Sequence, residues 1–162
     1  MRYRASWPIT TFALAMLIGG SAGAQQSMAT GRPMDVTFTD SLKWNPVAPP
    51  GFEQGLEMAV VSGDPSVAGQ PYVLRLRFPS DYRFPAHWHP VAENLTVLEG
   101  RFLIAPGEQR DDSKLKTYRP GDFLHFAAKH PHFGSVRGAT TVQLHGVGPF
   151  EIVVVGSPQD KR

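Results

Sequence analysis

The segment His87-Trp88-His89-Pro90-Val91-Ala92-Glu93 decides how this chain folds and what it holds. Side chains at positions i and i+2 of a strand point to the same face, so His87 and His89 can converge on one point. The proline that follows bends the chain and cannot donate to a sheet ladder, which lets Glu93 return from the next strand. Two imidazoles and a carboxylate suit a divalent transition ion. Because the flanks are apolar, we expect a metal site within a sheet rather than a solvated edge.

Residues 1–24 have the pattern of a cleavable signal peptide. Two arginines precede an apolar run, Thr11 to Ile18, which is too short to span a bilayer comfortably. Ala22-Gly23-Ala24 offers a small-x-small cleavage site, so we expect the cut after Ala24. The alternative is an uncleaved N-terminal anchor. Both interpretations place the domain outside the cytoplasm, and cleavage predicts a periplasmic or secreted protein without a stable membrane anchor.

Composition narrows the possible functions further. The chain of 162 residues has no cysteine, which excludes disulfides, thiolate ligands and a lipid-modified cysteine anchor. Its 16 basic and 14 acidic side chains become 14 and 14 once Arg2 and Arg4 are removed with the signal peptide. A near-neutral mature chain gives no reason to expect binding to nucleic acid or to an anionic membrane surface.

The rest of the chain reads as short strands separated by turns. We expect a flexible lead-in over residues 25–35 and one domain over residues 36–158. No stretch of a dozen residues after the signal shows a helical apolar repeat, and 15 prolines and 16 glycines punctuate the chain, which favours an antiparallel sandwich or barrel. The predicted strands are Val36–Thr39, Leu56–Val61, Tyr72–Phe78, Asn94–Glu99, Arg101–Ala105, Lys114–Tyr118, Phe123–Phe126, Thr140–His145 and Pro149–Val155. The strand Tyr72–Phe78 alternates, with its arginines on one face and its large apolar residues on the other.

Two motifs carry a resemblance to the cupin superfamily. His87-x-His89-x3-Glu93-x6-Gly100 is similar to the first cupin motif, although Asp81 stands where that motif usually opens with glycine. The second motif, Gly-x5-Pro-x-Gly-x2-His-x3-Asn, is matched only at Gly121 and His132. Its turn proline, turn glycine and final asparagine are replaced by Ala127, Lys129 and Val136. The resemblance covers roughly residues 70–155, and the whole resembles small secreted cupins with one domain.

The resemblance implies a cupin-type antiparallel jelly-roll β-barrel, all-β, with one metal ion inside. It implies His87, His89, Glu93 and His132 as the ligands of Mn, Fe, Ni, Cu, Co or Zn. Cupins commonly pair, so the resemblance also makes a homodimer possible, with residues 36–61 as a source of an edge strand for a partner.

Four further polar residues are candidates for roles near the metal. His130 competes with His132 as a ligand, and we place it at the rim or behind the ligands. His130, His125 and His145 are candidate proton-transfer groups, because imidazole titrates near neutrality. His125, Gln143 and His145 either line the cavity behind the ligands or lie on the solvated outside. Strand parity alone leaves both options open.

Two functions from different classes follow from these residues. The first is a metal-dependent enzyme that acts on a small oxygenated molecule, as a dioxygenase or other oxidoreductase, an isomerase or a decarboxylase. The second is a non-catalytic periplasmic module that binds or senses a small molecule or the metal itself. A complete ligand set favours the enzyme slightly, whereas the small size, without a lid domain, favours the binding module.

Overall fold

The structure, a computed structural model, describes residues 34–161. The predicted signal peptide and almost all of the predicted lead-in lie outside the described residues. Residues Val36–Arg162 form one compact unit. Within the described range, no helix has the length and apolar character needed to cross a membrane.

The unit is a single curled antiparallel sheet of nine strands. The first four strands are β1 (Asn45–Val47), β2 (Leu56–Gly63), β3 (Pro71–Phe78) and β4 (Arg83–Trp88). The others are β5 (Glu93–Pro106), β6 (Lys116–Tyr118), β7 (Phe123–Phe126), β8 (His132–Val147) and β9 (Val153–Val154). Two short 3₁₀ helices, η1 (Thr39–Ser41) and η2 (Asp112–Lys114), lie in the loops.

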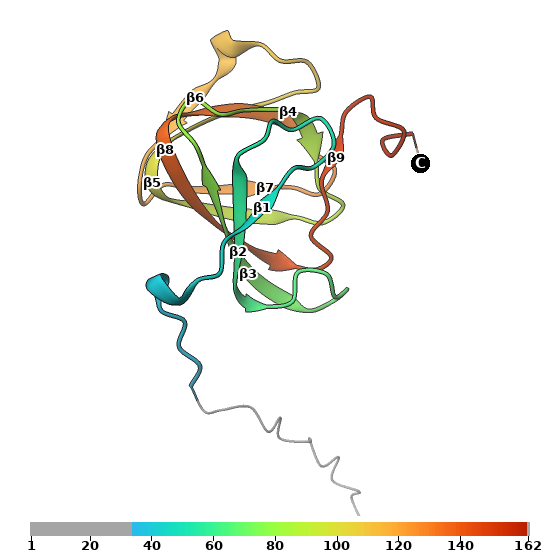
Figure 1. Cartoon of the computed structure of the whole chain (residues 1–162). Coiled ribbons are helices and arrows are strands. Elements are labelled where there is room, and N and C mark those ends of the chain that lie inside the picture. The colour runs from blue at the N-terminus through green and yellow to red at the C-terminus, as the bar shows by residue number, and fades with distance from the viewer. Residues whose placement is uncertain (1–33, 162) are drawn as a thin grey trace, which may run out of the picture. The chain divides into compact units, whose positions relative to one another are not determined.

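The long strands β5 and β8 pair with each other along most of their length and belong to both halves of the sheet. The C-terminal part of β8 pairs with β3, and its N-terminal part pairs with β4, so β8 passes from one half to the other (Figure 1). The pairing is irregular near Gly100, where φ is +78° and a Cβ would lie 2.3 Å from Thr140 Oγ1. Only glycine fits this bend without strain, and the bend lets the sheet curl.

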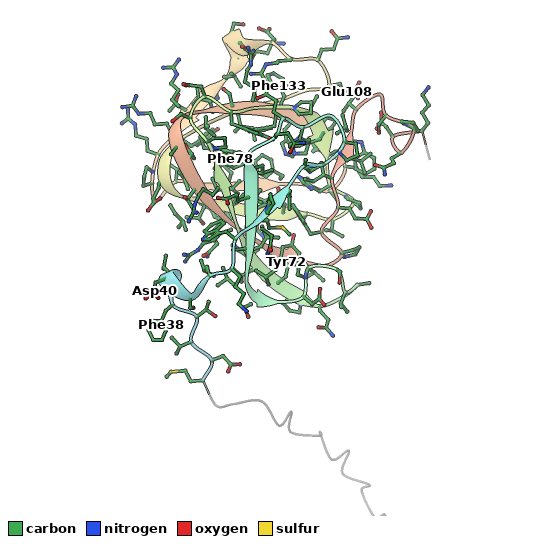
Figure 2. All side chains as sticks on the ribbon, in the orientation of Figure 1. Phe38, Asp40, Tyr72, Phe78, Glu108 and Phe133 are labelled. Atoms are coloured by element: carbon green, nitrogen blue, oxygen red, sulfur yellow. The ribbon has the colours of Figure 1, made fainter. Side chains whose placement is uncertain are left out.

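The core lies between the two halves. Tyr72, Leu74, Leu76 and Phe78 are buried on one face of β3, whereas Val73 and Arg75 on the other face are half-buried, which confirms the alternation predicted for this strand. From the other half, Phe84 and Phe102 stack with ring centroids 5.6 Å apart and meet Phe78. Figure 2 shows Tyr72 and Phe78 at different heights along β3.

Some predicted strands differ from the observed ones. The prediction of a strand over Val36–Thr39 is wrong, because this segment leads into η1. The two strands predicted on either side of Gly100 are one bent strand, β5. The strand predicted to begin at Thr140 begins at His132, because Gly134 and Gly138 interrupt its apolar pattern without ending its pairing.

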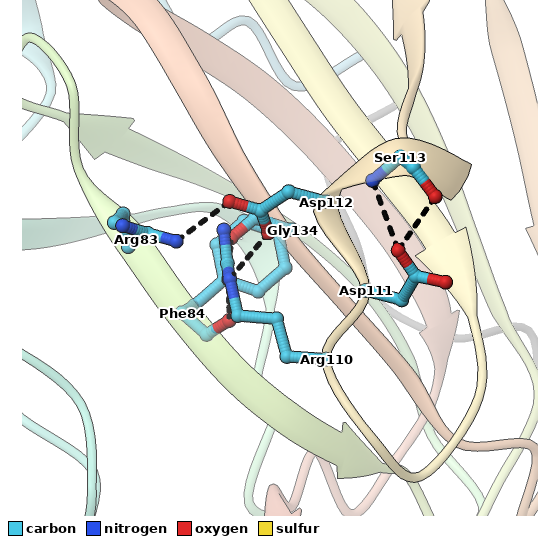
Figure 3. Close-up of polar contacts among 7 residues, drawn as sticks. All are labelled: Arg83, Phe84, Arg110, Asp111, Asp112, Ser113 and Gly134. Atoms are coloured by element: carbon cyan, nitrogen blue, oxygen red, sulfur yellow. Dashed lines mark hydrogen bonds and ion pairs between the residues drawn. The ribbon is translucent and has the colours of Figure 1, made fainter.

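Outside the barrel, the loop between β5 and β6 covers a second apolar cluster. Ala86, Ala105 and Phe133 are buried there, on the outward side of their strands. Arg110 lies over the Phe133 ring, donates to the backbone carbonyls of Phe84 and Gly134, and pairs with Asp112 at 2.7 Å (Figure 3). The loop is therefore fastened to the backbone of β4 and β8.

Two turns have a residue other than glycine in the left-handed backbone conformation that usually favours glycine. Asp81 and Lys129, which replace glycines of the two cupin motifs, have φ of +61° and +58°. The Lys129 amide also donates to the His89 carbonyl at 2.8 Å, which ties its turn to the segment after β4. The substitutions noted in the sequence therefore leave the left-handed turns intact, at some cost in backbone strain.

Candidate metal centre

A β-bulge in β4 turns the first histidine into the barrel. Pairing with β8 runs from Phe84↔Gly134 to His87↔His132, three residues on β4 against two on β8. The extra residue reverses the alternation, so Phe84 and His87 both face inward, while Ala86 belongs to the outer cluster. The same bulge leaves the two carbonyls that Arg110 satisfies.

Three buried imidazoles meet at this end of the barrel. One candidate ligand nitrogen from each of His87, His89 and His132 lies within 4.8 Å of the others. His87 and His89 share a face of one segment, as their spacing predicts, and His132 opens β8 directly opposite His87. The structure thus brings together histidines 43 to 45 residues apart in the sequence.

Backbone carbonyls fix the orientation of each ring. The Nδ1 atoms of His87, His89 and His132 lie 2.9, 2.7 and 3.1 Å from the carbonyl oxygens of Pro85, Glu151 and His130. Because a carbonyl only accepts, each Nδ1 donates a proton, and Nε2 of each neutral ring carries the lone pair. Carbonyls that hold Nδ1 in this way are typical of metal-binding histidines.

Glu93 reaches the same place from the start of β5. Its Oε2 lies 3.3 Å from His89 Nε2, its side chain is buried, and its Oε1 has no hydrogen-bond partner. Two electron-rich atoms that face each other at this distance need a positive species between them or beside them, either a proton or a cation. Glu93 therefore lies beside the three imidazoles, next to His89, although its carboxylate oxygens are outside the group of ligand atoms that lie within 4.8 Å of one another.

Burial governs the protonation of all four groups. Burial lowers the pKa of His89 to about 4, and burial together with His89 lowers the pKa of His132 to about 4. For His87, burial and then the two neighbouring imidazoles hold the pKa well below its usual value. Burial raises the pKa of the Glu93 carboxyl to about 8. Without a cation, the site at neutral pH therefore holds neutral imidazoles and a protonated carboxyl, and it carries little charge of its own.

Aromatic rings enclose the centre. Phe126 stacks on His132 with centroids 4.4 Å apart, Phe150 stacks on His89 at 5.5 Å, and Phe52 meets His87 edge-on at 5.1 Å. The cavity that these rings share with the four polar side chains has a volume of about 40 Å³, room for a few water molecules. Phe52 and Phe150 carry no site signal in the sequence. Phe52 lies outside the motifs, and Phe150 falls within the predicted strand Pro149–Val155, of which only Val153–Val154 forms a strand.

The remaining polar candidates lie away from the imidazoles. His125 is exposed and its Nδ1 lies 2.9 Å from Asn94 Oδ1, and His145 is opposite Asn94 on the outer face. Gln143 accepts from Arg75, also on that face. The structure thus favours the outer of the two placements left open by strand parity. His130 is exposed and contributes its backbone carbonyl to His132, while its own ring is at the rim.

Tyr72 is a further buried neighbour of Glu93. Tyr72, Gly146 and Glu93 stand side by side on β3, β8 and β5. The Tyr72 hydroxyl passes over Gly146, where a Cβ would lie 3.1 Å from it, and it is buried without a partner. Burial first, and then the Glu93 charge, raise the pKa of Tyr72 above its usual value.

Comparisons with known proteins agree with this architecture. The family model described as "Cupin domain" matches residues 74–153. The polyketide cyclase RemF from Streptomyces resistomycificus has a similar structure, with a TM-score of 0.63, 18% identity, and coverage of 78% of this chain and 89% of that one. A putative acetylacetone dioxygenase from Methylibium petroleiphilum PM1 gives a TM-score of 0.59, 17% identity and coverage of 82% and 88%.

A cupin-2 domain from Rhodospirillum rubrum gives a TM-score of 0.58 at 12% identity and covers 81% of this chain and 86% of its own. A comparison with curated protein sequences found no match. At these identities the likeness concerns the fold alone. The chemistry has to be argued from the residues of this chain.

Proposed function

Because this chain belongs to the cupin superfamily, we propose that it is an exported metal-dependent enzyme that acts on a small oxygenated molecule. The observation that carries the proposal is the convergence of three buried imidazoles, each held at Nδ1 by a carbonyl, beside a buried carboxyl with an unpartnered oxygen. Buried polar atoms without partners are rare in proteins, and a bound cation would account for the unpartnered oxygen of Glu93.

His87, His89 and His132 would bind one divalent transition ion through Nε2, and Glu93 would supply the one anionic ligand. The donor set of imidazole nitrogen and carboxylate oxygen suits Mn, Fe, Ni, Cu, Co or Zn. When bound, such an ion polarises an oxygen-bearing ligand and holds it in place.

The chain's own residues prepare the site in three ways. The carbonyl contacts fix the three rings before any ion arrives, so little ordering is needed on binding. Glu93 would lose its proton to solvent on binding a cation and would then act as a carboxylate ligand. The apolar lining keeps bulk water away and strengthens every electrostatic contact inside.

One observation favours the alternative, a binding or sensing module without turnover. In the described part of the chain, the lining of the inner cavity holds no ionisable side chain besides the four candidate ligands. His130 and His145, the candidate proton-transfer groups, do not line it. Chemistry here would then rely on the ion and on Glu93 alone, whereas binding needs no further group.

Export rests on the N-terminal sequence pattern, a positive start, a short apolar run and the cleavage site at Ala22-Gly23-Ala24. We expect a mature protein that begins at Gln25, periplasmic or secreted. Mass spectrometry of the N-terminus after expression in a Gram-negative host tests this, and an uncleaved Met1 on membrane-bound protein would contradict it.

The decisive experiment measures metal content and turnover on the same sample. Elemental analysis of the exported protein should give about one transition ion per chain. The H87A/H89A/H132A variant should carry almost none, while H130A should match the parent. With the metal identified, oxygen uptake and product formation are followed with phenolics and small keto acids. Loading without any turnover would favour the binding module, and equal metal content in all variants would remove the site.

A further inference from the structure

A second, larger cavity adjoins the metal centre between the edge strands β6 and β7. It has a volume of about 360 Å³ and is called the vestibule below. Among the residues that line it are Ile104, Lys116, Tyr118, Phe123, Phe126 and His132. Ile104, Phe126 and His132 also line the inner cavity, so these three side chains form the wall between the two spaces.

Of the three side chains in this wall, Phe126 is the one best placed to open a path between the two cavities. It is the last residue of β7, it is only half-buried, and its ring lies flat against His132 with 24° between the planes. After it comes an exposed segment, Ala127–His130, which leads back to β8. A rotation of this one side chain would join the vestibule to the three imidazoles without a change in the sheet.

The lining of the vestibule has a distinct chemistry. Its apolar part includes three aromatic residues, Tyr118, Phe123 and Phe126, beside aliphatic ones such as Ile104 and Leu124. Phe123 is 58% exposed although it is a large hydrophobic residue. Its polar part includes Lys114 and Lys116, and no carboxylate belongs to the lining that the structure describes. Lys114 is paired with Asp111 at 3.5 Å, whereas Lys116 has no ion-pair partner among residues 34–161.

From this combination we infer that the vestibule receives a small planar aromatic anion, a carboxylate or a phenolate, and passes its oxygen-bearing end to the metal centre. Aromatic walls bind a flat ring by stacking, and a cationic rim without an acid attracts an anion. The inner cavity of about 40 Å³ accepts only the reacting group, so the ring of the ligand has to remain in the vestibule.

This inference names the substrate class of the proposed function and rests on it, so its test begins with metal-free protein. Benzoate and benzamide, which have nearly the same shape but differ in charge, are titrated by calorimetry at neutral pH. Benzoate should bind severalfold more tightly than benzamide. K116Q should weaken benzoate by about fivefold, a size expected for one exposed charge, and leave benzamide within about twofold.

Three controls sharpen this comparison. K114Q should have a smaller effect than K116Q, because Lys114 is already paired. K43Q removes the same charge from an exposed site outside the vestibule and should have none. F123A lines the vestibule but not the inner cavity, so it should weaken both ligands. Equal affinity for the two ligands, or a benzoate affinity unchanged in K116Q, would overturn the inference.

The passage at Phe126 is tested on Co²⁺-loaded protein by visible spectroscopy. Benzoate should shift the cobalt bands at saturation, and after rapid mixing the shift should develop severalfold faster in F126A because the wall is open. Benzoate bound in the vestibule with no spectral change in either protein would overturn the passage. A protein that binds benzoate as expected but never loads Co²⁺ would disprove the proposed metal centre and leave the anion site standing.

Discussion

Arg110 and Glu93 are two ionisable residues withdrawn from solvent, and the fold satisfies their polar atoms to different degrees. Arg110, on the outer face, donates through Nη1 to two backbone carbonyls and pairs through Nε with the Asp112 carboxylate, so that only its Nη2 is left without a partner (Figure 3). Glu93, inside the barrel, has an oxygen without any partner and faces a lone pair of His89. The contacts of Arg110 hold a loop against the sheet, whereas the Glu93 carboxyl faces His89 in an arrangement that requires a proton or a cation. The contrast separates residues that stabilise this fold from residues that cost stability and serve a ligand.

The largest effect expected from this contrast concerns metal affinity. E93Q keeps the size of the side chain and removes the only anionic ligand, so Co²⁺ affinity should fall by more than about 100-fold, beyond the loss typical for a residue that only supports a ligand. Competition titration with a coloured chelator measures it.

The matched control is H130A, which removes an exposed ring next to the site and keeps the carbonyl that holds His132. Its affinity should stay within about twofold of the parent, as expected for a surface side chain. Loss of Co²⁺ in H130A together with retention in E93Q would reverse the assignment.

The pH dependence comes next in size. Burial raises the pKa of Glu93 from 4.5 to about 8, so metal-free protein gains stability from this carboxyl fully below about pH 4.5 and loses it as the pH rises through about 8. A cation needs the carboxylate, so affinity should rise about tenfold per pH unit up to about pH 8 and then level off. The pKa of His89 and of His132 is about 4, so these rings do not titrate in this range.

Titrations of Co²⁺ between pH 6 and 8 check this expectation. E93Q, with no carboxyl, should show a nearly flat affinity over the same range. A flat profile in the parent protein would mean that Glu93 is already ionised in the barrel, and the contrast with Arg110 would then fail.

On the other side of the contrast, R110M should lower the free energy of unfolding by about 2 kcal/mol. The change removes charge-assisted donors from two carbonyls that the β4 bulge leaves free, and such bonds contribute about 1.5–3 kcal/mol. R83M removes the other, exposed partner of Asp112 and should cost less than about 1 kcal/mol. Urea unfolding measures both, and metal loading of the folded protein should be unchanged.

The smallest effect distinguishes two buried tyrosines. The Tyr82 hydroxyl donates to the Glu53 carbonyl, so Y82F should cost about 1 kcal/mol of unfolding free energy. The Tyr72 hydroxyl has no partner, so Y72F in metal-free protein should change stability by less than about 0.5 kcal/mol or even increase it. Thermal unfolding of the two variants, side by side, gives the comparison. Equal losses would show that Tyr72 has a partner after all.

Much of the fold was predictable because it depends on local pattern. The alternation of Tyr72–Phe78 follows directly from period-two hydrophobicity, and the strand Phe123–Phe126 follows from a short apolar run; the structure confirms both. The i, i+2 spacing of His87 and His89 likewise fixed their common face. The first half of β8 was missed because its glycines break the pattern, although the pairing with β4 and β5 continues through them.

The rest of the site depends on contacts that sequence pattern does not encode. Strand parity could not decide whether His125, Gln143 and His145 face the barrel, since parity says which residues share a face and not which face is inside. Phe150 stacks on His89 from more than 60 residues away, and it does so from the loop between β8 and β9 rather than from the strand predicted over Pro149–Val155. Aromatic enclosure of this kind emerges only from the folded topology.

The extra residue of the β4 bulge determines the direction in which the histidines of the candidate metal site point. Phe84 and His87 face the interior together only because the strand carries one residue more than its partner across Gly134 and His132. A β4 of the same length that paired regularly from Phe84 onward would turn both imidazoles of the pair toward solvent, whereas deletion of one residue from Pro85-Ala86 would remove the bulge and keep them inside. Chelation in this barrel thus depends on the match between strand length and pairing as well as on the identity of the side chains.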